Sequence, residues 1–272
     1  MKDALTNIVQ QMYTTISSGT GTDLLTLSLS GFNGVAYSYI KLILENVALP
    51  IAYTILALFA LLELWKASTH LEGSGGHLGI EIIIRVMVRV ILCKLLVDYS
   101  LTIMEAIFEA ALYLTTQIQA TVANMDVGSL TGLTSDSDIA EIENTIGFFS
   151  QLGLLIELKI YQLAIQIVML LVNVICLGRF IEIYVYIAIA PIPLATLPSE
   201  ELGQVGKNFL KSFTAVCIQG ALIFLVLTFF PMFAASIPAT LSGRFAALTL
   251  VLILAFAVLR CNQWAKSICN AM

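Results

Sequence analysis

Long runs of apolar residues alternate along the chain with short polar segments. A membrane-spanning helix needs about 20 mostly apolar residues, because the hydrocarbon core is about 30 Å thick and a helix rises about 1.5 Å per residue. Six stretches come near this requirement. They are residues 42–64, 80–97, 148–177, 180–197, 212–233 and 245–259. The pattern therefore predicts an all-α fold, a transmembrane helical bundle.

The fourth of these stretches differs from the others because Pro191 and Pro193 interrupt it. Proline lacks the N–H of the helical ladder and its ring clashes with the preceding turn, so an uninterrupted helix across residues 180–197 is not expected. Irregular backbone at membrane depth has to be buried in protein or line a cavity. We therefore expect a re-entrant or bent segment here and about five full spans elsewhere.

Lys and Arg are distributed unevenly, and this predicts how the chain is oriented, because segments outside the cytoplasm are poor in them. No basic residue lies between Lys94 and Lys159, whereas nine acidic residues do. We expect that segment outside the cytoplasm. With five spans the N-terminus lies outside and the C-terminus inside; a sixth span would place Lys207 and Lys211 outside, against the rule.

These features divide the chain into four segments. Residues 1–40 are expected to form extracytoplasmic amphipathic helices, since one helical face within residues 1–18 is apolar. Residues 41–98 hold the first two transmembrane helices and a Gly-rich cytoplasmic loop. Residues 99–147 form an acidic extracytoplasmic segment, and residues 148–272 form the C-terminal transmembrane bundle.

Composition agrees with a membrane location and excludes other classes. Hydrophobic residues make up 59% of the 272 residues and charged residues only 11%, whereas a soluble domain carries about 25% charged residues. The net charge of -5 argues against a surface that grips nucleic acid through its phosphates. The five cysteines form no CxxC pair, so we expect no disulfide framework, no metal site and no cofactor.

Seven charged residues within or beside the apolar stretches form a candidate intramembrane charge network. Charges inside a span are costly unless they are paired or face water, so we expect these side chains to point into the bundle or a pore. The set is Glu81, Arg85, Arg89, Glu157, Lys159, Arg179 and Glu182. Two interpretations stay open: the charges neutralise one another and fix helix register, or they line a charged seam of an oligomeric channel.

Motifs for catalysis or nucleotide binding are missing from the sequence. Gly73, Gly75 and Gly76 are not followed by the Lys and Ser/Thr that a phosphate-binding loop requires. His70 and His77 flank these glycines without further metal ligands nearby, which is typical of a loop. There is no GxSxG and no HExxH motif. The sequence therefore assigns no catalytic residue, and we expect the protein not to be an enzyme.

The segment from Gly178 to Ile223 carries a more specific pattern. It reads GRFIEIYVYIAIAPIPLATLPSEELGQVGKNFLKSFTAVCIQGALI. An apolar helix headed by Arg leads to an Ala-Pro-Ile-x-Leu-Ala break, an acidic loop with glycines, and a Lys-Asn-Phe-Leu-Lys start to the next span. This resembles the C-terminal half of the TrbL-type polytopic inner-membrane component of type IV secretion and conjugation machines, with a resemblance extending over residues 40–265.

The resemblance implies a non-enzymatic channel or scaffold subunit in the cytoplasmic membrane of a bacterium, where it helps form the path for transferred DNA or protein. Its expected partners are further copies of itself in a homo-oligomer, other membrane subunits of the machine, and the lipid bilayer. DNA or protein would be transient cargo, without sequence-specific nucleic-acid binding. A secondary transporter or ion permease is the alternative, because a proline-broken segment beside charged residues is also typical of transport sites.

Overall fold

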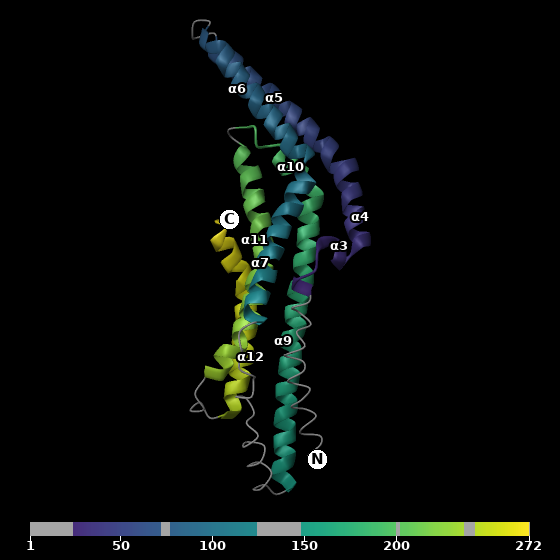
Figure 1. The fold of residues 1–272 in the computed structure, drawn as a ribbon, viewed down its shortest axis with the longest axis vertical. Helices are drawn as coiled ribbons and strands as arrows, with labels where there is room; N and C mark the ends of the chain where they lie inside the picture. Colours follow the sequence, from purple (N-terminus) through teal and green to yellow (C-terminus); the bar gives the residue numbers. More distant parts are fainter. Residues whose placement is uncertain (1–23, 72–76, 124–147, 200–201, 237–242, 272) are drawn as a thin grey trace. The chain divides into compact units, whose positions relative to one another are not determined.

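The computed structural model describes residues 24–71, 77–123, 148–199, 202–236 and 243–271, and the regular structure in these ranges is helical (Figure 1). The helices are α3 (Leu29–Phe32), α4 (Gly34–Ile43), η1 (Leu44–Ala48), α5 (Leu49–Leu71), α6 (His77–Asp98), α7 (Ser100–Ala123), α9 (Phe148–Ile189), α10 (Pro191–Leu194), α11 (Gly203–Ser236) and α12 (Gly243–Ile268). The prediction of an all-α fold is confirmed. The predicted amphipathic helix in residues 1–18 and the core of the acidic segment, residues 124–147, lie outside the described ranges.

The first long helical run changes direction where α4 passes into α5 (Figure 1). The residues between them, Leu44–Ala48, form the π-helical turn η1 immediately before Pro50 in α5. Pro50 has no N–H to donate to the carbonyl one turn earlier, and its ring needs room there. The wider π-turn supplies this room, so the helix bends at this point and does not end.

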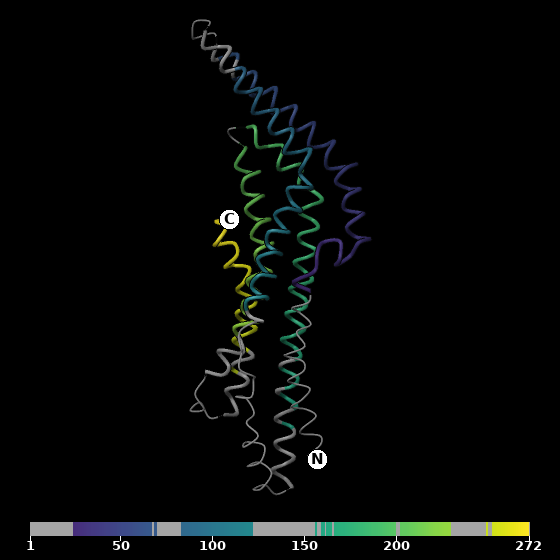
Figure 2. Tube along the Cα trace, in the orientation of Figure 1, coloured from purple at the N-terminus to yellow at the C-terminus, as the bar shows by residue number. Residues whose placement is uncertain are grey.

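Helices α5 and α6 lie side by side as an antiparallel hairpin (Figure 2). At the end of the hairpin away from its loop, the Tyr53 hydroxyl donates a hydrogen bond to the Asp98 carboxylate, with 2.7 Å between the oxygens. Both helices rise by the same distance per residue. Arg85 of α6 is therefore at about the same level as Lys66 of α5, at the loop end of the hairpin.

Helix α9 is continuous over 42 residues, a length of about 63 Å and roughly twice the thickness of the hydrocarbon core. The boundary expected near Gly178 and Arg179, between two separate apolar stretches, was wrong. A Cβ at Gly178 would have no atom within 4 Å, and the Arg179 side chain is only 4% exposed. The helix passes through both residues and ends at Ile189.

The described residues group into two compact units. The first contains Leu112–Gly178 and Gln219–Trp264; the second contains Ser28–Ala111, Arg179–Ile218 and Ala265–Met272. Each unit has a buried apolar cluster of its own. In the first, side chains of α9, α11 and α12 meet in a cluster that includes Val172, Cys176, Ile223, Val258 and Cys261.

Three helical segments in the described ranges are long and apolar enough to cross a membrane. They are Gly34–Lys66, Gln162–Ile189 and Gly203–Phe229. The first and third overlap the predicted stretches 42–64 and 212–233, whereas Gln162–Ile189 runs across two predicted stretches, 148–177 and 180–197. Two further predicted spans coincide with α6 and α12, and the expected total of about five crossings stays a prediction.

Candidate functional site

The two prolines of the sequence pattern lie in a tight turn between the long helices α9 and α11. Helix α9 ends at Ile189, the single helical turn α10 begins at Pro191, and α11 begins at Gly203. Proline is well suited to the first position of a helix, because the N–H that it lacks would have no helical partner there. Helix α9 thus ends immediately before the prolines that interrupt the apolar stretch in the sequence.

Polar groups of this proline turn are bonded within the turn itself. The N–H of Ala195 donates to the carbonyl of Pro191 at 3.0 Å, and the hydroxyl of Thr196 donates to the carbonyl of Pro193 at 2.8 Å. The buried hydroxyl of Ser199 accepts a backbone N–H just before α11, at 3.2 Å. An irregular segment that satisfies its own polar groups can be buried among apolar helices.

The first turn of α11 packs directly against the proline turn, and glycine makes the contact possible. A Cβ at Gly206 would lie 2.7 Å from the carbonyl oxygen of Pro193 and 2.8 Å from Cγ of Leu197. A Cβ at Gly203 would lie 3.2 Å from the carbonyl oxygen of Leu197. The glycines of the acidic loop are therefore needed for a close approach between backbones.

The proline turn is also anchored in the apolar cluster of the second unit. Leu194 is 1% exposed and Ala195 is fully buried. Both belong to the cluster in which Ala52 and Leu56 of α5 meet Cys93 and Val97 of α6. The turn thus fixes the ends of α9 and α11 against the α5–α6 hairpin.

A cluster of aromatic side chains holds the segment before α4 against α9. The ring of Phe180 stacks on Phe32, with centroids 4.2 Å apart and planes 3° from parallel, and Phe108 of α7 approaches it at 6.3 Å. The Tyr184 hydroxyl donates to the carbonyl of Leu29 at 2.7 Å. Parallel stacking and a buried phenol hydrogen bond both fix geometry as well as burying area.

Exposure divides the predicted charge network. Arg179 is buried, and its guanidinium lies 5.1 Å from the ring centroid of Phe180. Glu182, less than one helical turn further along α9, is exposed. Lys159 is also exposed, and its ammonium donates to the side-chain carbonyl of Gln162 at 3.0 Å. Arg179 therefore has a structural environment that the other two residues do not share.

On α6, Arg85 is exposed and Arg89 is partly exposed. The side chains of Glu81 and Glu157 lie outside the part of the chain whose side chains the structure describes. The charge network as a whole stays a prediction. Its exposed members are placed where a second molecule or water could reach them, unlike Arg179.

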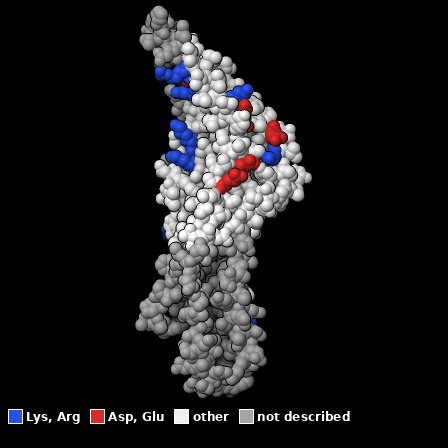
Figure 3. Space-filling model, viewed as in Figure 1, with Lys and Arg blue, Asp and Glu red and all other residues white. Residues whose placement is uncertain are grey.

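Lys and Arg side chains gather over α6 and the start of α11, whereas Asp and Glu gather over α7 and near η1 (Figure 3). Within the second unit, Lys207 is exposed and Lys211 is partly exposed at the start of α11. We call Arg85, Arg89, Lys207 and Lys211 the basic surface. The two arginines and the two lysines lie on different helices of the second unit, and no local sequence pattern links them.

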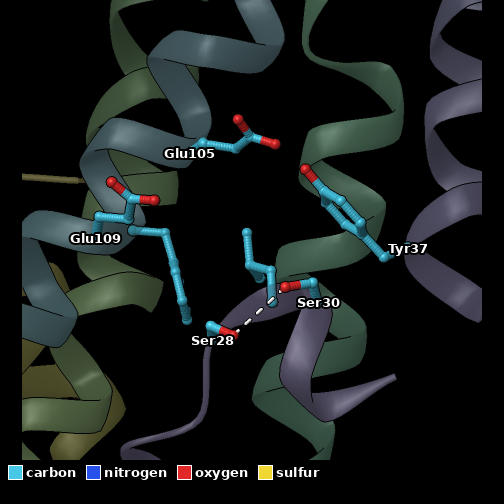
Figure 4. Close-up of a pocket in the computed structure, with 7 residues that line it drawn as sticks. Ser28, Ser30, Tyr37, Glu105 and Glu109 are labelled. Carbon is cyan, nitrogen blue, oxygen red and sulfur yellow. Dashed lines mark hydrogen bonds between the residues drawn. The ribbon is translucent and has the colours of Figure 1, made fainter. Parts of the chain in front are cut away.

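A small cavity of about 140 Å³ lies between α7 and the segment around α3 and α4. Figure 4 shows Glu105 and Glu109 on one side, with Tyr37, Ser28 and Ser30 opposite. Burial, reinforced by the nearby Glu109 carboxylate, raises the pKa of Glu105 above its ordinary value. The sequence signal for this cavity was weak: two glutamates one helical turn apart, with no link to the serines.

An all-helical chain with membrane-length apolar helices and many exposed large hydrophobic side chains is a membrane protein of the helical class. Comparison with protein families refines this class. The chain belongs to the TrbL/VirB6 plasmid conjugal transfer like family, whose model matches residues 9–191. Comparison with curated proteins and with solved structures found no match.

Family membership confirms the resemblance drawn from the sequence pattern and makes the chain a bacterial component of type IV secretion or conjugation. The matched region contains α3 to α9 and ends at Pro191. Only the first part of the pattern in residues 178–223 therefore lies inside it. Members of this family are structural components of secretion systems.

Proposed function

We propose that this chain is a non-enzymatic channel or scaffold subunit of the inner-membrane part of a type IV secretion or conjugation machine. The observation that carries the proposal is the family match over residues 9–191. The exposed arginines of α6 support it. Arg85 lies on an apolar helix, where a charge is costly unless it faces water, lipid head groups or a partner.

The basic surface suits a subunit that lies beside a polyanion without reading its sequence. Lys and Arg attract phosphates through charge, and this attraction needs no contact with bases. A path for a transferred strand has to let the strand move on, so a few distributed cations are better suited than a dense basic groove. The net charge of -5 fits this limited role.

In the proposed orientation, the N-terminus lies outside the cytoplasm, and the loop of the α5–α6 hairpin and the C-terminus lie inside. Lys66 and Arg85 lie at the loop end of the hairpin, which supports a cytoplasmic loop under the positive-inside rule. Single cysteines introduced next to Lys207 and labelled in intact cells test the arrangement. Labelling from outside would restore a sixth span and overturn this orientation.

A contact experiment tests the channel role. A photo-crosslinking amino acid in place of Arg85 is expected to capture the transferred strand during active conjugation. The same group in place of Met87, which is 52% exposed on α6 and lies about half a turn around the helix from Arg85, is the matched control and should capture little. Transfer that continues with no adduct at Arg85 would show that the chain does not line the path.

The proline turn does not favour the transporter alternative. A transport site at a broken helix offers unwound backbone groups to its substrate. Here the carbonyls of Pro191 and Pro193 accept hydrogen bonds within the turn, and Leu194 and Ala195 are packed in an apolar cluster. The break therefore serves packing in this structure.

A further inference from the structure

A shallow groove of about 560 Å³ lies along one face of α12 in the first compact unit. The described residues that line it belong to this helix and follow one another at helical spacings of three and four. We call it the α12 groove. Its lining includes Thr249, Leu252, Ile253, Phe256, Arg260 and Trp264. The groove is therefore apolar along most of its length and carries an arginine and a tryptophan at one end.

The other side of the same helix is used by the fold. Leu254, Val258 and Cys261 are buried in the apolar cluster of the first unit. On the side of the groove, Phe256 is 60% exposed and Trp264 is 44% exposed. The core thereby fixes the rotation of α12 about its axis and leaves the groove open to whatever surrounds the helix.

The length of the groove matches one leaflet of a bilayer. Between Thr249 and Arg260 the helix rises about 16 Å, which is close to half of a hydrocarbon core of about 30 Å. Arg260 also follows directly after the predicted span, residues 245–259. The apolar part of the groove is thus suited to a lipid acyl chain, and Arg260 and Trp264 are then at the level of the lipid head groups.

The charge of Arg260 is not offset by acidic residues of its own part of the chain. No Asp or Glu follows Glu201 in the sequence, whereas five basic residues do, so α11 and α12 supply no carboxylate. The Arg260 guanidinium lies 5.2 Å from the ring centroid of Phe256. This cation–π contact holds the charge beside the groove without neutralising it. A cation at the end of an apolar groove suits an anion that is joined to an apolar chain.

The two polar side chains at this end suit a phosphate head group. A guanidinium donates two parallel hydrogen bonds to phosphate oxygens, a geometry that a point charge does not offer. Trp264 is four residues further along α12, on the same face, and its indole combines an apolar ring with one N–H donor. A zwitterionic lipid would also bring its own cation near Arg260. A head group with a net negative charge avoids this repulsion.

We propose that the α12 groove binds one phospholipid with an anionic head group, with the phosphate on Arg260 and an acyl chain along Leu252, Ile253 and Phe256. An apolar helix of another protein would cover the groove but leave the arginine without an anion. In the proposed orientation this end of α12 meets the cytoplasmic leaflet, whose anionic lipids attract basic residues. The proposal goes beyond the proposed function, since it holds whether or not the subunit lines a path.

Lipids with a photoreactive acyl chain test the site in the full chain, reconstituted in nanodiscs of phosphatidylcholine with a minority of phosphatidylglycerol. A phosphatidylglycerol probe is expected to label residues 252–257 several-fold more than a phosphatidylcholine probe does. Leu170 and Val174 of α9, 65% and 59% exposed and without a basic residue nearby in the sequence, are the control and should be labelled equally by both. Equal labelling of the groove by the two probes would overturn the proposal.

Arg260→Gln should weaken binding of the phosphatidylglycerol probe about tenfold, as expected for a lost charge-assisted hydrogen bond. Arg260→Lys, which keeps the charge and loses the fork, should weaken it less. Lys266→Gln is the matched control. It removes the same charge from the exposed surface of the last turn of α12, about a third of a turn around the helix from Arg260, and should leave binding nearly unchanged. Equal losses for Arg260→Gln and Lys266→Gln would show general attraction to charge and no site.

A photo-crosslinking amino acid in place of Ile253 identifies the occupant in bacterial membranes. The adduct is expected to contain phospholipid, enriched in anionic species relative to the adduct formed from the same group in place of Leu170. An adduct with a second copy of the chain or with another protein would overturn the proposal, since the groove would then be a protein contact. Ile253 is 54% exposed, so the replacement leaves the apolar cluster intact.

Discussion

The proline turn and the basic surface belong to the same compact unit, and both contain residues that are conspicuous in the sequence. Their environments differ. In the turn, Pro193 and Gly206 are in close backbone contact, and their neighbours are buried. On the basic surface, Arg85 and Lys207 are exposed. A substitution in the turn should change stability, whereas a substitution on the basic surface should change only what the protein does with its partners.

The difference also bears on the family pattern. The Ala-Pro-Ile-x-Leu-Ala break and the following glycines have a packing role, because they join two long helices through a compact turn. Their presence therefore does not by itself indicate a binding site. Arg85 and Arg89 instead lie on the exposed or partly exposed side of an apolar helix. Substitutions on α6 should therefore affect function, and substitutions in the proline turn should affect stability.

The largest effect is expected for Gly206→Val. The new side chain would meet the Pro193 carbonyl at 2.7 Å, and backbone on that side cannot move away easily. We expect a loss of about 3 kcal/mol or more in stability, seen as aggregation or a much lower midpoint of thermal unfolding in detergent.

Gly178→Ala is the matched control for that variant. It introduces a Cβ into a helix at a position with no atom within 4 Å. Alanine is favoured over glycine within a helix by about 1 kcal/mol, so the midpoint of thermal unfolding should remain unchanged or rise. A monodisperse Gly206→Val protein with an unchanged midpoint would contradict the packing described for the turn.

A smaller loss is expected for Tyr184→Phe. The change removes the hydroxyl that donates to the carbonyl of Leu29 at 2.7 Å and keeps the ring. Leaving a buried carbonyl without this donor should cost about 1–2 kcal/mol. Thermal unfolding in detergent measures it, and Tyr39→Phe on a side chain that is 64% exposed should have almost no effect. Equal effects from the two variants would show that the hydrogen bond does not hold the segment before α4.

The helices and their approximate ends could be predicted from the sequence because apolar runs and prolines act locally. The apolar stretch at residues 80–97 corresponds to α6 in the structure, and the helix end before Pro191 follows from the missing N–H. The boundary near Arg179 failed because a charge next to glycine is typical of a helix end. Here the aromatic ring of Phe180 and burial keep the arginine inside the helix.

The spatial groupings could not be predicted, because each depends on contacts between distant segments. Phe32 and Phe180 are separated by more than half of the length of the chain, and no local pattern links them. The same holds for the basic surface and for the cavity at Glu105. The role of Gly206 depends on an oxygen of Pro193 that comes close only once the turn has formed.

A modest effect of opposite sign is expected for Glu105→Gln. The pKa of Glu105 in the folded protein is raised, mainly by burial and further by Glu109. As the pH rises from the ordinary carboxyl pKa of about 4.3 through the raised value, the unfolded chain releases this proton first, and stability falls. Near neutral pH the variant should therefore unfold at a slightly higher temperature than the unmodified chain.

The dependence of stability on pH tests whether the raised pKa of Glu105 causes the effect. The stability of the Glu105→Gln variant should fall less than that of the unmodified chain between acidic and neutral pH. Glu109→Gln should give a change in the same direction, because it removes the neighbouring negative charge. A Glu105→Gln variant that is less stable at neutral pH would show instead that the carboxylate has a favourable partner in the cavity.

The smallest effect on stability is expected for the double variant Arg85→Gln, Arg89→Gln, and this variant tests the comparison most directly. Because both side chains are at least partly exposed, the free energy of unfolding should change by less than about 0.5 kcal/mol. Conjugative transfer should nevertheless fall about tenfold or more, the equivalent of about 1.4 kcal/mol of lost interaction. Lys41→Gln, a partly exposed lysine on α4, is the control and should leave transfer unchanged. If the double variant unfolds at a clearly lower temperature and its transfer frequency falls by a matching amount, these arginines stabilise the fold, as the residues of the proline turn do.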